Sequence, residues 1–141
     1  MDGISAGTGS LAMFTAMTRD EVQDWLDRYV TAWRGNDAEQ IGALFNEEAL
    51  YSYRPWESDE VTVRGRDAIV ASWLESPDDP GSWEAQYQPF AVEAHRAAAV
   101  GWSRYFASED EPEKLYHNVF LLGFDDTGRC STFHEFYMFQ S

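Results

Sequence analysis

The chain has 141 residues, of which 44% are hydrophobic, so it is long enough to form one domain with its own packed core. Its formal net charge of −15 leaves no basic stripe for nucleic-acid phosphates or for an anionic membrane surface, and we expect neither partner. The single cysteine, Cys130, excludes an intrachain disulfide and a cysteine-based metal site, and it fits a reducing cytoplasm.

The first residues carry no signal for a folded element. Residues 1–17 are rich in Gly and Ser. Their short apolar stretch, 11–14, has no basic region before it and is too short to cross a bilayer. We therefore expect a flexible N-terminal tail over residues 1–17 and a single domain over residues 18–141.

Three helices are predicted in the first half of the domain. Thr18 and Glu21 form a capping box before a run of apolar residues at helical spacing, which predicts a helix from Arg19 to Arg34. Asp37 can cap a short second helix, and Gly65 precedes a third. The residues predicted to form the buried faces of the second and third helices are Ile41, Leu44 and Phe45, and Ile69, Val70 and Trp73.

The second half of the chain changes to a period of two. Alternation of Trp83, Ala85 and Tyr87 with polar residues predicts a half-exposed strand. Further strands are predicted at Ala49–Tyr53, Ala97–Ala107, Leu115–Phe124 and Cys130–Phe139. Helices first and hairpin-connected strands later indicate an α+β fold rather than a βαβ order.

One predicted strand is apolar on both faces. In residues 115–124, Asn118 and Phe120 share one face, whereas Val119 and Leu121 lie on the other. Such a strand is covered on both sides in a folded protein. The helices can cover one side, and we expect a second copy of the chain to cover the other in a sheet-to-sheet homodimer.

Four segments of the sequence, taken in this order, resemble a known protein family. They are RYVTAWRGNDAEQIGALFNEEALYSY, VRGRDAIVASW, VGWSRY and FLLGFDDTGRCSTFHEFYM. On these segments the chain resembles the nuclear transport factor 2-like superfamily and, within it, the SnoaL-like group. The resemblance implies a cystatin-like cone, in which a curved antiparallel sheet wraps around N-terminal helices and encloses a pocket. Because that superfamily contains isomerases, cyclases, hydrolases, dehydratases and non-catalytic binders, the fold does not settle the function.

The resemblance also implies a set of pocket residues from the helices and strands. The expected catalytic set is Glu135, Arg104, Tyr53 and Tyr51. The expected ligand-binding set is Tyr29, Trp33, Trp56, Trp73, Trp102, Tyr116, Asn118, Phe120, Phe133 and Tyr137. We expect a small apolar molecule as the ligand, and no cofactor or metal ion.

Two catalytic relatives can be compared with the chain. In ketosteroid isomerases a helix tyrosine and a strand acid form an oxyanion hole beside an aspartate base. Tyr29 matches that tyrosine, but Tyr53 and Phe120 stand where the two acids are needed, so this chemistry is not expected. The chain resembles limonene-epoxide hydrolase in Tyr51, with Tyr53 replacing an asparagine and Glu135 an aspartate. The middle-strand aspartate of that family has no counterpart, so the relay is incomplete.

Glu135 is the central candidate, and two interpretations of it stay open. It stands among aromatic residues, where a carboxylate needs a partner or a raised pKa. It is either a general acid/base or one half of a buried ion pair with Arg104 on a neighbouring strand. Arg104 could also bind a substrate carboxylate or polarise a carbonyl oxygen. Tyr51 and Tyr53 would position substrate or water, and Asn118 would bind ligand or tie down a neighbouring strand.

Three hypotheses about function follow from these residues. The first is a cofactor-free isomerase, cyclase or hydrolase that acts on an apolar substrate. The second is a non-catalytic binding or accessory domain with the same pocket. The third is a protein-interaction module that uses the sheet face and the acidic loop. By strand parity His117 and His134 point away from the pocket, which argues against a metal site there.

Overall fold

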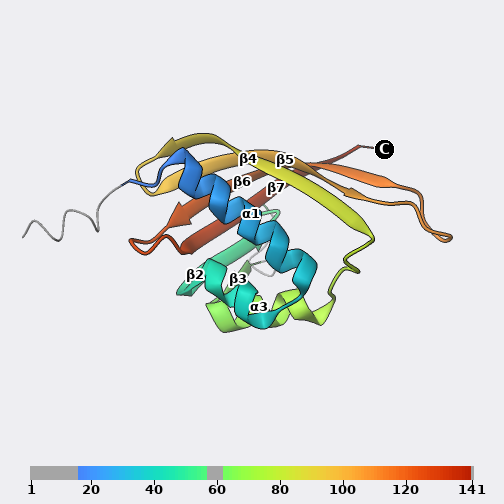
Figure 1. Cartoon of the computed structure of the whole chain (residues 1–141), viewed down its shortest axis with the longest axis horizontal. Coiled ribbons are helices and arrows are strands. Elements are labelled where there is room, and N and C mark those ends of the chain that lie inside the picture. The colour runs from blue at the N-terminus through green and yellow to red at the C-terminus, as the bar shows by residue number, and fades with distance from the viewer. Residues whose placement is uncertain (1–15, 57–61, 141) are drawn as a thin grey trace, which may run out of the picture.

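The computed structural model describes residues 16–56 and 62–140 (Figure 1). In this part of the chain, three helices pack against one curved six-stranded sheet. The elements in chain order are α1 (Arg19–Gly35), α2 (Ala38–Leu44), β2 (Phe45–Tyr53), β3 (Thr62–Arg64), α3 (Arg66–Glu75), β4 (Trp83–Glu93), β5 (Arg96–Tyr105), β6 (Lys114–Phe124) and β7 (Cys130–Gln140). The predicted α+β order is confirmed.

The strands lie in the order β3-β2-β7-β6-β5-β4. Strands β4 to β7 form an antiparallel meander, and β3 is antiparallel to β2. The pair formed by β2 and β7 is parallel, with Tyr51 opposite Phe133 and Tyr53 opposite Glu135. The sheet is therefore antiparallel except where β2 lies beside β7, the last strand of the chain.

The ends of the first two helices follow the predicted capping signals. Thr18 Oγ1 accepts a hydrogen bond from the Glu21 backbone N–H, and Glu21 Oε1 accepts one from the Thr18 N–H. Asn36 adopts a left-handed conformation with φ of 51° and ends α1. Asp37 then caps α2 by accepting hydrogen bonds from two backbone N–H groups of its first turn.

Helix α1 lies across the inner face of the sheet and builds the core with it (Figure 1). Trp25 is fully buried, and its indole N–H donates to the Leu44 carbonyl oxygen at 3.0 Å. Phe120 and Phe133, from β6 and β7, lie with ring centroids 4.8 Å apart in the same cluster. These rings fill the interior beneath the cavity described below, so the cavity has a rigid aromatic floor.

Two predicted boundaries differ from the structure by more than one residue. Phe45 was expected on the buried face of the second helix, but it has extended backbone angles and begins β2 opposite Cys130. It is fully buried all the same, because the strand turns its ring into the core. Strand β5 ends at Tyr105 rather than at Ala107, since the next N–H, that of Phe106, bonds to the Ser82 carbonyl.

Strand β6 has the two apolar faces that the sequence predicts. Asn118 and Phe120 are buried on the inner face, whereas Val119 and Leu121 are 39% and 45% exposed on the outer one. The inner face is covered by α1. The single chain leaves the outer face open at these residues, so its cover by a second copy stays a prediction.

The N-terminal part of the expected tail, residues 1–15, lies outside the described residues, as do residues 57–61 in the expected polar loop. The last residue of that tail, Met17, donates its backbone N–H to the Ala94 carbonyl at 2.9 Å and packs against the core. Among the helices of residues 16–56 and 62–140, none has the length and apolar character needed to cross a membrane.

Candidate functional site

A cavity of about 640 Å³ lies between the helices and the inner face of the sheet. This volume is in the range of small-molecule sites. Helices α1 and α3, strands β2 and β4 to β7, and the loops after α3 and β5 all contribute to its wall. All seven tyrosines of the chain line it: Tyr29, Tyr51, Tyr53, Tyr87, Tyr105, Tyr116 and Tyr137.

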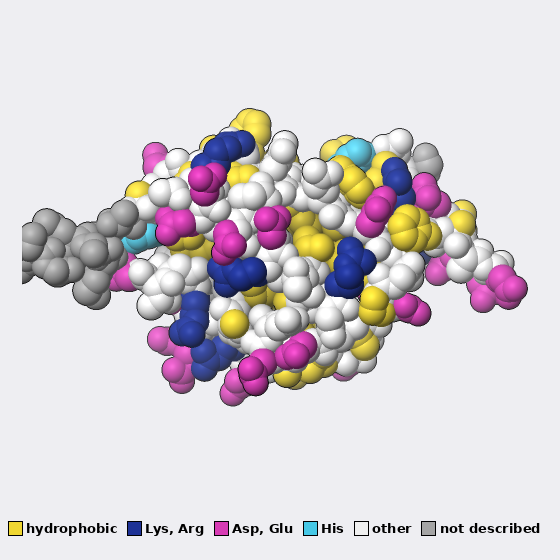
Figure 2. All heavy atoms as spheres, viewed as in Figure 1, with side chains coloured by type: hydrophobic (Ala, Val, Ile, Leu, Met, Phe, Trp, Pro, Cys, Tyr) yellow, Lys and Arg dark blue, Asp and Glu magenta, His cyan; other side chains and the backbone are white. Residues whose placement is uncertain are grey.

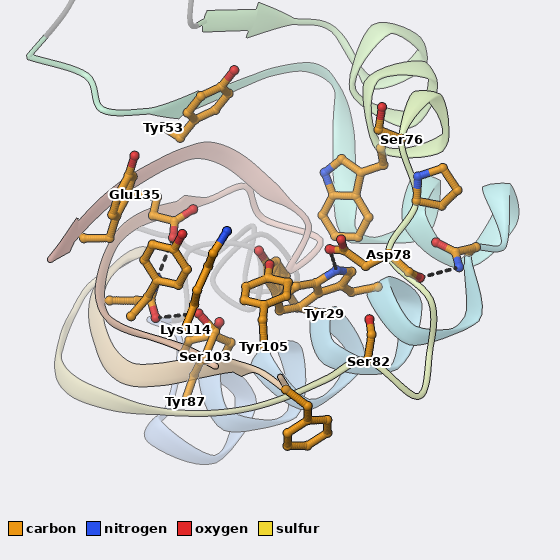
Figure 3. A pocket seen from close by; sticks show the side chains of 18 of the residues that line it. Tyr29, Tyr53, Ser76, Asp78, Ser82, Tyr87, Ser103, Tyr105, Lys114 and Glu135 are labelled. Atoms are coloured by element: carbon orange, nitrogen blue, oxygen red, sulfur yellow. Dashed lines mark hydrogen bonds between the residues drawn. The ribbon is translucent and has the colours of Figure 1, made fainter. Parts of the chain in front are cut away.

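Glu135 brings a carboxyl group into this aromatic wall. It lies on β7, next to Tyr53 of β2 and Phe120 of β6 in the strand register. Figure 3 shows its carboxyl group on the same side of the cavity as Lys114, with Asp78 facing them. Asn118 Nδ2 donates to Glu135 Oε2 at 2.6 Å. Among the described residues no cationic side chain forms an ion pair with Glu135, and Asn118 is the one hydrogen-bond partner of its carboxyl group.

The pKa of Glu135 follows from these surroundings. Burial disfavours the charged carboxylate and raises the pKa from 4.5 to about 7, while the Asn118 hydrogen bond acts in the opposite direction. A single amide donor thus compensates only part of the lost hydration. Because its pKa lies near neutrality, Glu135 holds both protonation states in comparable amounts at physiological pH.

A chain of hydrogen bonds fixes the orientation of Asn118. Ser103 Oγ donates to Asn118 Oδ1 at 3.2 Å, so the amide turns its NH₂ group toward Glu135. The Tyr87 hydroxyl lies close to Ser103. Both Ser103 and Asn118 are buried. Asn118 therefore links β5, β6 and β7 through side-chain hydrogen bonds, and it also lines the cavity. The two interpretations of Asn118 that the sequence left open are thus compatible.

Tyr29 and Tyr51 form a second polar pair in the wall. The hydroxyl groups of Tyr29 and Tyr51 lie close together, and burial raises the pKa of both groups well above the ordinary value. The nearby charge of Glu135 raises them further. Tyr51 also stacks on Phe133 with ring centroids 4.7 Å apart. Both tyrosines are therefore fixed, neutral O–H groups at any pH at which the protein would work.

The loop after α3 closes one side of the mouth. Asp78 Oδ2 accepts from the Trp33 indole N–H at 3.0 Å, and burial together with the nearby Asp78 charge raises the pKa of Tyr105. Asn36 Nδ2 donates to the Asp78 carbonyl at 3.3 Å. These contacts anchor a segment that the sequence marks only as a helix breaker. Asp78 itself could not be found from sequence, because its partners come from α1 and β5.

The other side of the mouth carries Lys114 and Glu111. Lys114 Nζ donates to Glu111 Oε1 at 2.9 Å, and both side chains are partly exposed. Lys114 is the one basic side chain that lines the cavity within the described residues. A carboxylate from the adjoining loop therefore balances the charge of Lys114. The acidic loop between β5 and β6 forms part of the rim of the cavity.

Much of the expected site is brought together in the cavity wall. The expected residues that line it are Tyr29, Trp33, Tyr51, Tyr53, Trp73, Tyr116, Asn118, Glu135 and Tyr137. Two further expected residues, Phe120 and Phe133, lie in the core beneath, with 1% and 0% exposure. They support the tyrosine rings from below and do not contact the cavity itself. The chemical roles assigned to all these residues stay predictions.

Arg104 and Trp102 are not in the cavity, and the expected ion pair between Arg104 and Glu135 is wrong. Strand β5 turns Ser103 and Tyr105 inward, so its even-numbered neighbours face outward. Arg104 Nη1 donates to Glu84 Oε1 at 3.3 Å, and its guanidinium lies over the Trp102 ring. The arginine is thus committed to the outer surface of the sheet.

Trp56 also lies away from the cavity. It is 57% exposed and stacks on Phe136, with ring centroids 5.6 Å apart. Phe136 follows Glu135 on β7 and therefore faces the opposite side of the sheet. The turn at Arg54, which has a φ of 56°, carries the chain round to that side.

Tyr87, Ser103 and Tyr105 are the wall residues on β4 and β5 that the sequence interpretation missed. Tyr87 was detectable, because it belongs to the predicted inward alternation of β4. Its ring packs over Gly101 of β5, where an added Cβ would lie 2.5 Å from Tyr87 Cδ1 and 2.0 Å from the Gln86 carbonyl oxygen. A glycine is therefore required at this position for β4 and Tyr87 to approach β5 so closely.

The histidines take no part in the cavity wall. His117 is exposed and lies 2.7 Å from Gln140 Oε1, and His134 faces the outer side of β7. Within residues 16–56 and 62–140, no three His, Cys, Asp or Glu side chains are grouped so as to hold a metal ion.

Comparison with known proteins agrees with this architecture. The cone of helices and curved sheet around an aromatic cavity defines a nuclear transport factor 2-like α+β protein. A profile of the SnoaL-like domain matches residues 26–135, and the chain therefore belongs to the SnoaL-like domain family. No curated protein matches the sequence significantly.

Solved structures share the fold at low sequence identity. An epoxide hydrolase of the limonene-epoxide hydrolase-like type from M. tuberculosis is 10% identical, with a TM-score of 0.62 over 85% of this chain and 84% of that one. A protein of unknown function with a cystatin-like fold from Methylobium petroleophilum is 17% identical, with a TM-score of 0.64 over 90% and 82%. An NTF-2 like protein from Burkholderia xenovorans is 13% identical, with a TM-score of 0.62 over 86% and 88%. These likenesses establish the fold alone.

Proposed function

We propose that this protein is a cofactor-independent enzyme that transfers protons to or from a small molecule held in the cavity, with Glu135 as the general acid/base. The observation that carries the proposal is a partly buried carboxyl group that has one amide partner and no cationic partner among the described residues, and that lines a cavity of about 640 Å³. Its pKa of about 7 suits proton transfer at neutral pH. Isomerisation, cyclisation and hydrolysis are the reaction classes that such a group can serve.

The remaining wall residues supply positioning and electrostatic support. Negative charge that develops on a substrate oxygen needs fixed donors, and Arg104 on the outer face cannot provide them. Tyr51, held by Tyr29 and by its stacking on Phe133, is the best-placed neutral donor. Tyr53, next to Glu135 in the sheet, is positioned to hold substrate or water near the carboxyl group.

Epoxide hydrolysis receives less support than the general proposal. The M. tuberculosis neighbour is an epoxide hydrolase, but at 10% identity it shares the fold rather than a demonstrated site. The relay expected of that chemistry needs an arginine between two carboxylates. In this chain Arg104 pairs with Glu84 and Glu113 on the far side of the sheet from Glu135.

The test is turnover of small lactones, epoxides and enolisable ketones by the native chain and by Glu135→Gln. Loss of a general acid/base lowers kcat by about 10²- to 10⁴-fold. The matched control is Glu48→Gln, which removes one negative charge from an exposed position of β2 outside the cavity. An unchanged rate in Glu135→Gln, for any substrate that the native chain converts, would end the assignment.

A non-catalytic ligand-binding domain is the second candidate. The specific observation in its favour is that the other carboxyl group facing the interior, Asp78, already accepts a hydrogen bond from the Trp33 indole N–H. A second free acid/base group is therefore absent from the wall within the described residues, apart from the Glu111 and Lys114 pair at the rim. Ligand that co-purifies and dissociates unchanged, in both the native chain and Glu135→Gln, would favour this candidate.

We also propose that the outer sheet face joins two copies of the chain. Val119, Leu121 and Met138 are 39%, 45% and 75% exposed on or beside the central strands. Burial of such apolar surface against a second sheet would remove it from water. We propose a cytoplasmic location as well. The lone Cys130 thiol supports it, because this thiol is buried and forms no disulfide.

A further inference from the structure

The cavity wall has an uneven distribution of charge. Glu135, Asp78 and Glu111 contribute three carboxyl groups to it, whereas Lys114 is the one amine, and no arginine of the described chain reaches it. Lys114 is already paired with Glu111. Figure 2 shows that acidic side chains also spread over the helical face of the molecule and gather at the tip of the loop between β5 and β6. An anionic ligand would therefore meet repulsion at the mouth and find no free cation inside.

The aromatic lining adds a second feature that favours positive charge. The faces of tyrosine and tryptophan rings attract cations through the ring quadrupole, most strongly where water is excluded. Seven tyrosines, together with Trp33 and Trp73, line the cavity that holds the Glu135 carboxyl group. Four of those tyrosines, Tyr29, Tyr51, Tyr87 and Tyr105, lie near enough to Glu135 to feel its charge.

The hydrogen bonds of the wall leave the Glu135 carboxylate incompletely satisfied. Oε2 accepts from Asn118, and no tyrosine hydroxyl of the described wall forms a hydrogen bond with either carboxylate oxygen. A buried carboxylate needs a counter-charge or several donors to stay ionised. Within residues 16–56 and 62–140 the protein supplies one amide, so the missing counter-charge is available from a ligand.

From these observations we infer that the cavity takes an aromatic or aliphatic amine, whose protonated nitrogen pairs with Glu135 while its apolar body lies against the tyrosine rings. The inference rests on the proposed function and names its substrate class. It changes the expected ligand from a purely apolar molecule to an amphipathic one.

The same pair can carry the proton transfer that the proposed function requires. When Glu135 takes a proton from the ammonium nitrogen, the carboxylate becomes a carboxylic acid and the ligand becomes a neutral amine with a free lone pair. Proton number and charge balance, since one anion and one cation give two neutral groups. A low-dielectric cavity favours neutral groups over separated charges, so the transfer would release a nucleophilic amine for ring closure or addition.

The experiment compares three probes of similar size by isothermal titration calorimetry at about pH 8, where Glu135 is mostly ionised. They are phenethylamine (a cation), 2-phenylethanol (neutral) and 3-phenylpropionate (an anion). We expect phenethylamine to bind at least about tenfold more tightly than 2-phenylethanol, which corresponds to about 1.4 kcal/mol, and 3-phenylpropionate to bind most weakly. In Glu135→Gln the preference for the amine should disappear while the alcohol binds as before.

Two controls separate the cavity from the overall negative charge. Glu48→Gln removes the same amount of negative charge from the protein and should keep the preference for the amine. Added salt screens distant charges but not a buried pair, so the preference should also persist at about 0.3 M NaCl. In the unmodified protein the preference should weaken below about pH 6, as Glu135 becomes protonated. This last measurement does not depend on the folding of any variant.

Equal affinities for the three probes, tighter binding of the anion, or an amine preference that survives in Glu135→Gln would each overturn the inference. Absence of amine binding at millimolar concentration would do so as well. The proposed function fails by a different result, namely turnover that is insensitive to Glu135→Gln.

Discussion

Substitution of Glu135 by Gln should stabilise the unliganded protein at high pH. Folding takes the carboxyl group from water, where its pKa is 4.5, to a cavity wall where it is about 7. Since the folded-state pKa is the higher one, the unfolded chain releases this proton first as the pH rises. The folded state therefore loses stability between about pH 4.5 and pH 7, and above that range the whole penalty is present.

The size of the effect follows from the two pKa values. A tenfold change in proton affinity corresponds to about 1.4 kcal/mol, so the difference between 4.5 and about 7 amounts to about 3 kcal/mol at pH 8. Gln keeps the shape of the protonated acid and an oxygen that can accept from Asn118. The variant and the native chain should accordingly have similar free energies of unfolding near pH 4.5, and the variant should be more stable by about 3 kcal/mol near pH 8.

Urea unfolding of both chains across this pH range, followed by circular dichroism, measures the difference directly. Glu48→Gln serves as the control, because Glu48 is exposed and its substitution should produce no comparable dependence on pH. A difference between the native chain and Glu135→Gln that stays constant with pH would show that the carboxyl group is hydrated, and the reasoning would be refuted.

Three further changes test other parts of the account. Asn118→Leu removes the one donor to the carboxylate, so the pKa of Glu135 should rise further, which the pH dependence of unfolding would reveal as a transition at higher pH. Arg104→Gln alters only the outer face, so turnover and ligand affinity should stay within about twofold of native; a loss of about tenfold or more would contradict its placement. Leu121→Glu places a charge on the exposed apolar face and should convert a dimer to monomers in analytical ultracentrifugation, whereas a native chain that is already monomeric would refute the dimer.

The sequence predicted those parts of the fold that depend on local signals. The capping box at Thr18 and the cap at Asp37 are short-range features, and both occur as expected. Strand β7 was also oriented correctly. Its neighbours β2 and β6 offer matching inward residues, such as Tyr51 and Asn118, so that a consistent face could be chosen from the pattern.

Strand β5 shows where this reasoning fails. Its two faces present Ser103 and Tyr105 on one side and Trp102 and Arg104 on the other, and both sets are plausible linings for a pocket. The family resemblance favoured the larger and more basic pair. The actual choice is fixed by pairing with β6, where Ser103 lies opposite Tyr116, and this long-range register has no local signature.

The residues at the mouth of the cavity could not be predicted from the sequence for a related reason. Asp78 lies in a segment of prolines and acids that predicts only the end of a helix. Its role depends on Trp33 and Tyr105, which are 45 and 27 positions away in the chain. Contacts of this kind arise from the assembled fold, because loops carry no periodic pattern from which their partners can be inferred.

The central claim is that the Glu135 carboxyl group lies in the cavity without a cationic partner. Titration of this group tests the claim most directly. Carbon-13 NMR of the side-chain carboxyl, in protein labelled at glutamate and assigned with Glu135→Gln, reports the pKa of this single group. The account predicts a midpoint at about pH 7 in the unliganded protein. A midpoint near 4.5, the value of a hydrated glutamate, would contradict it.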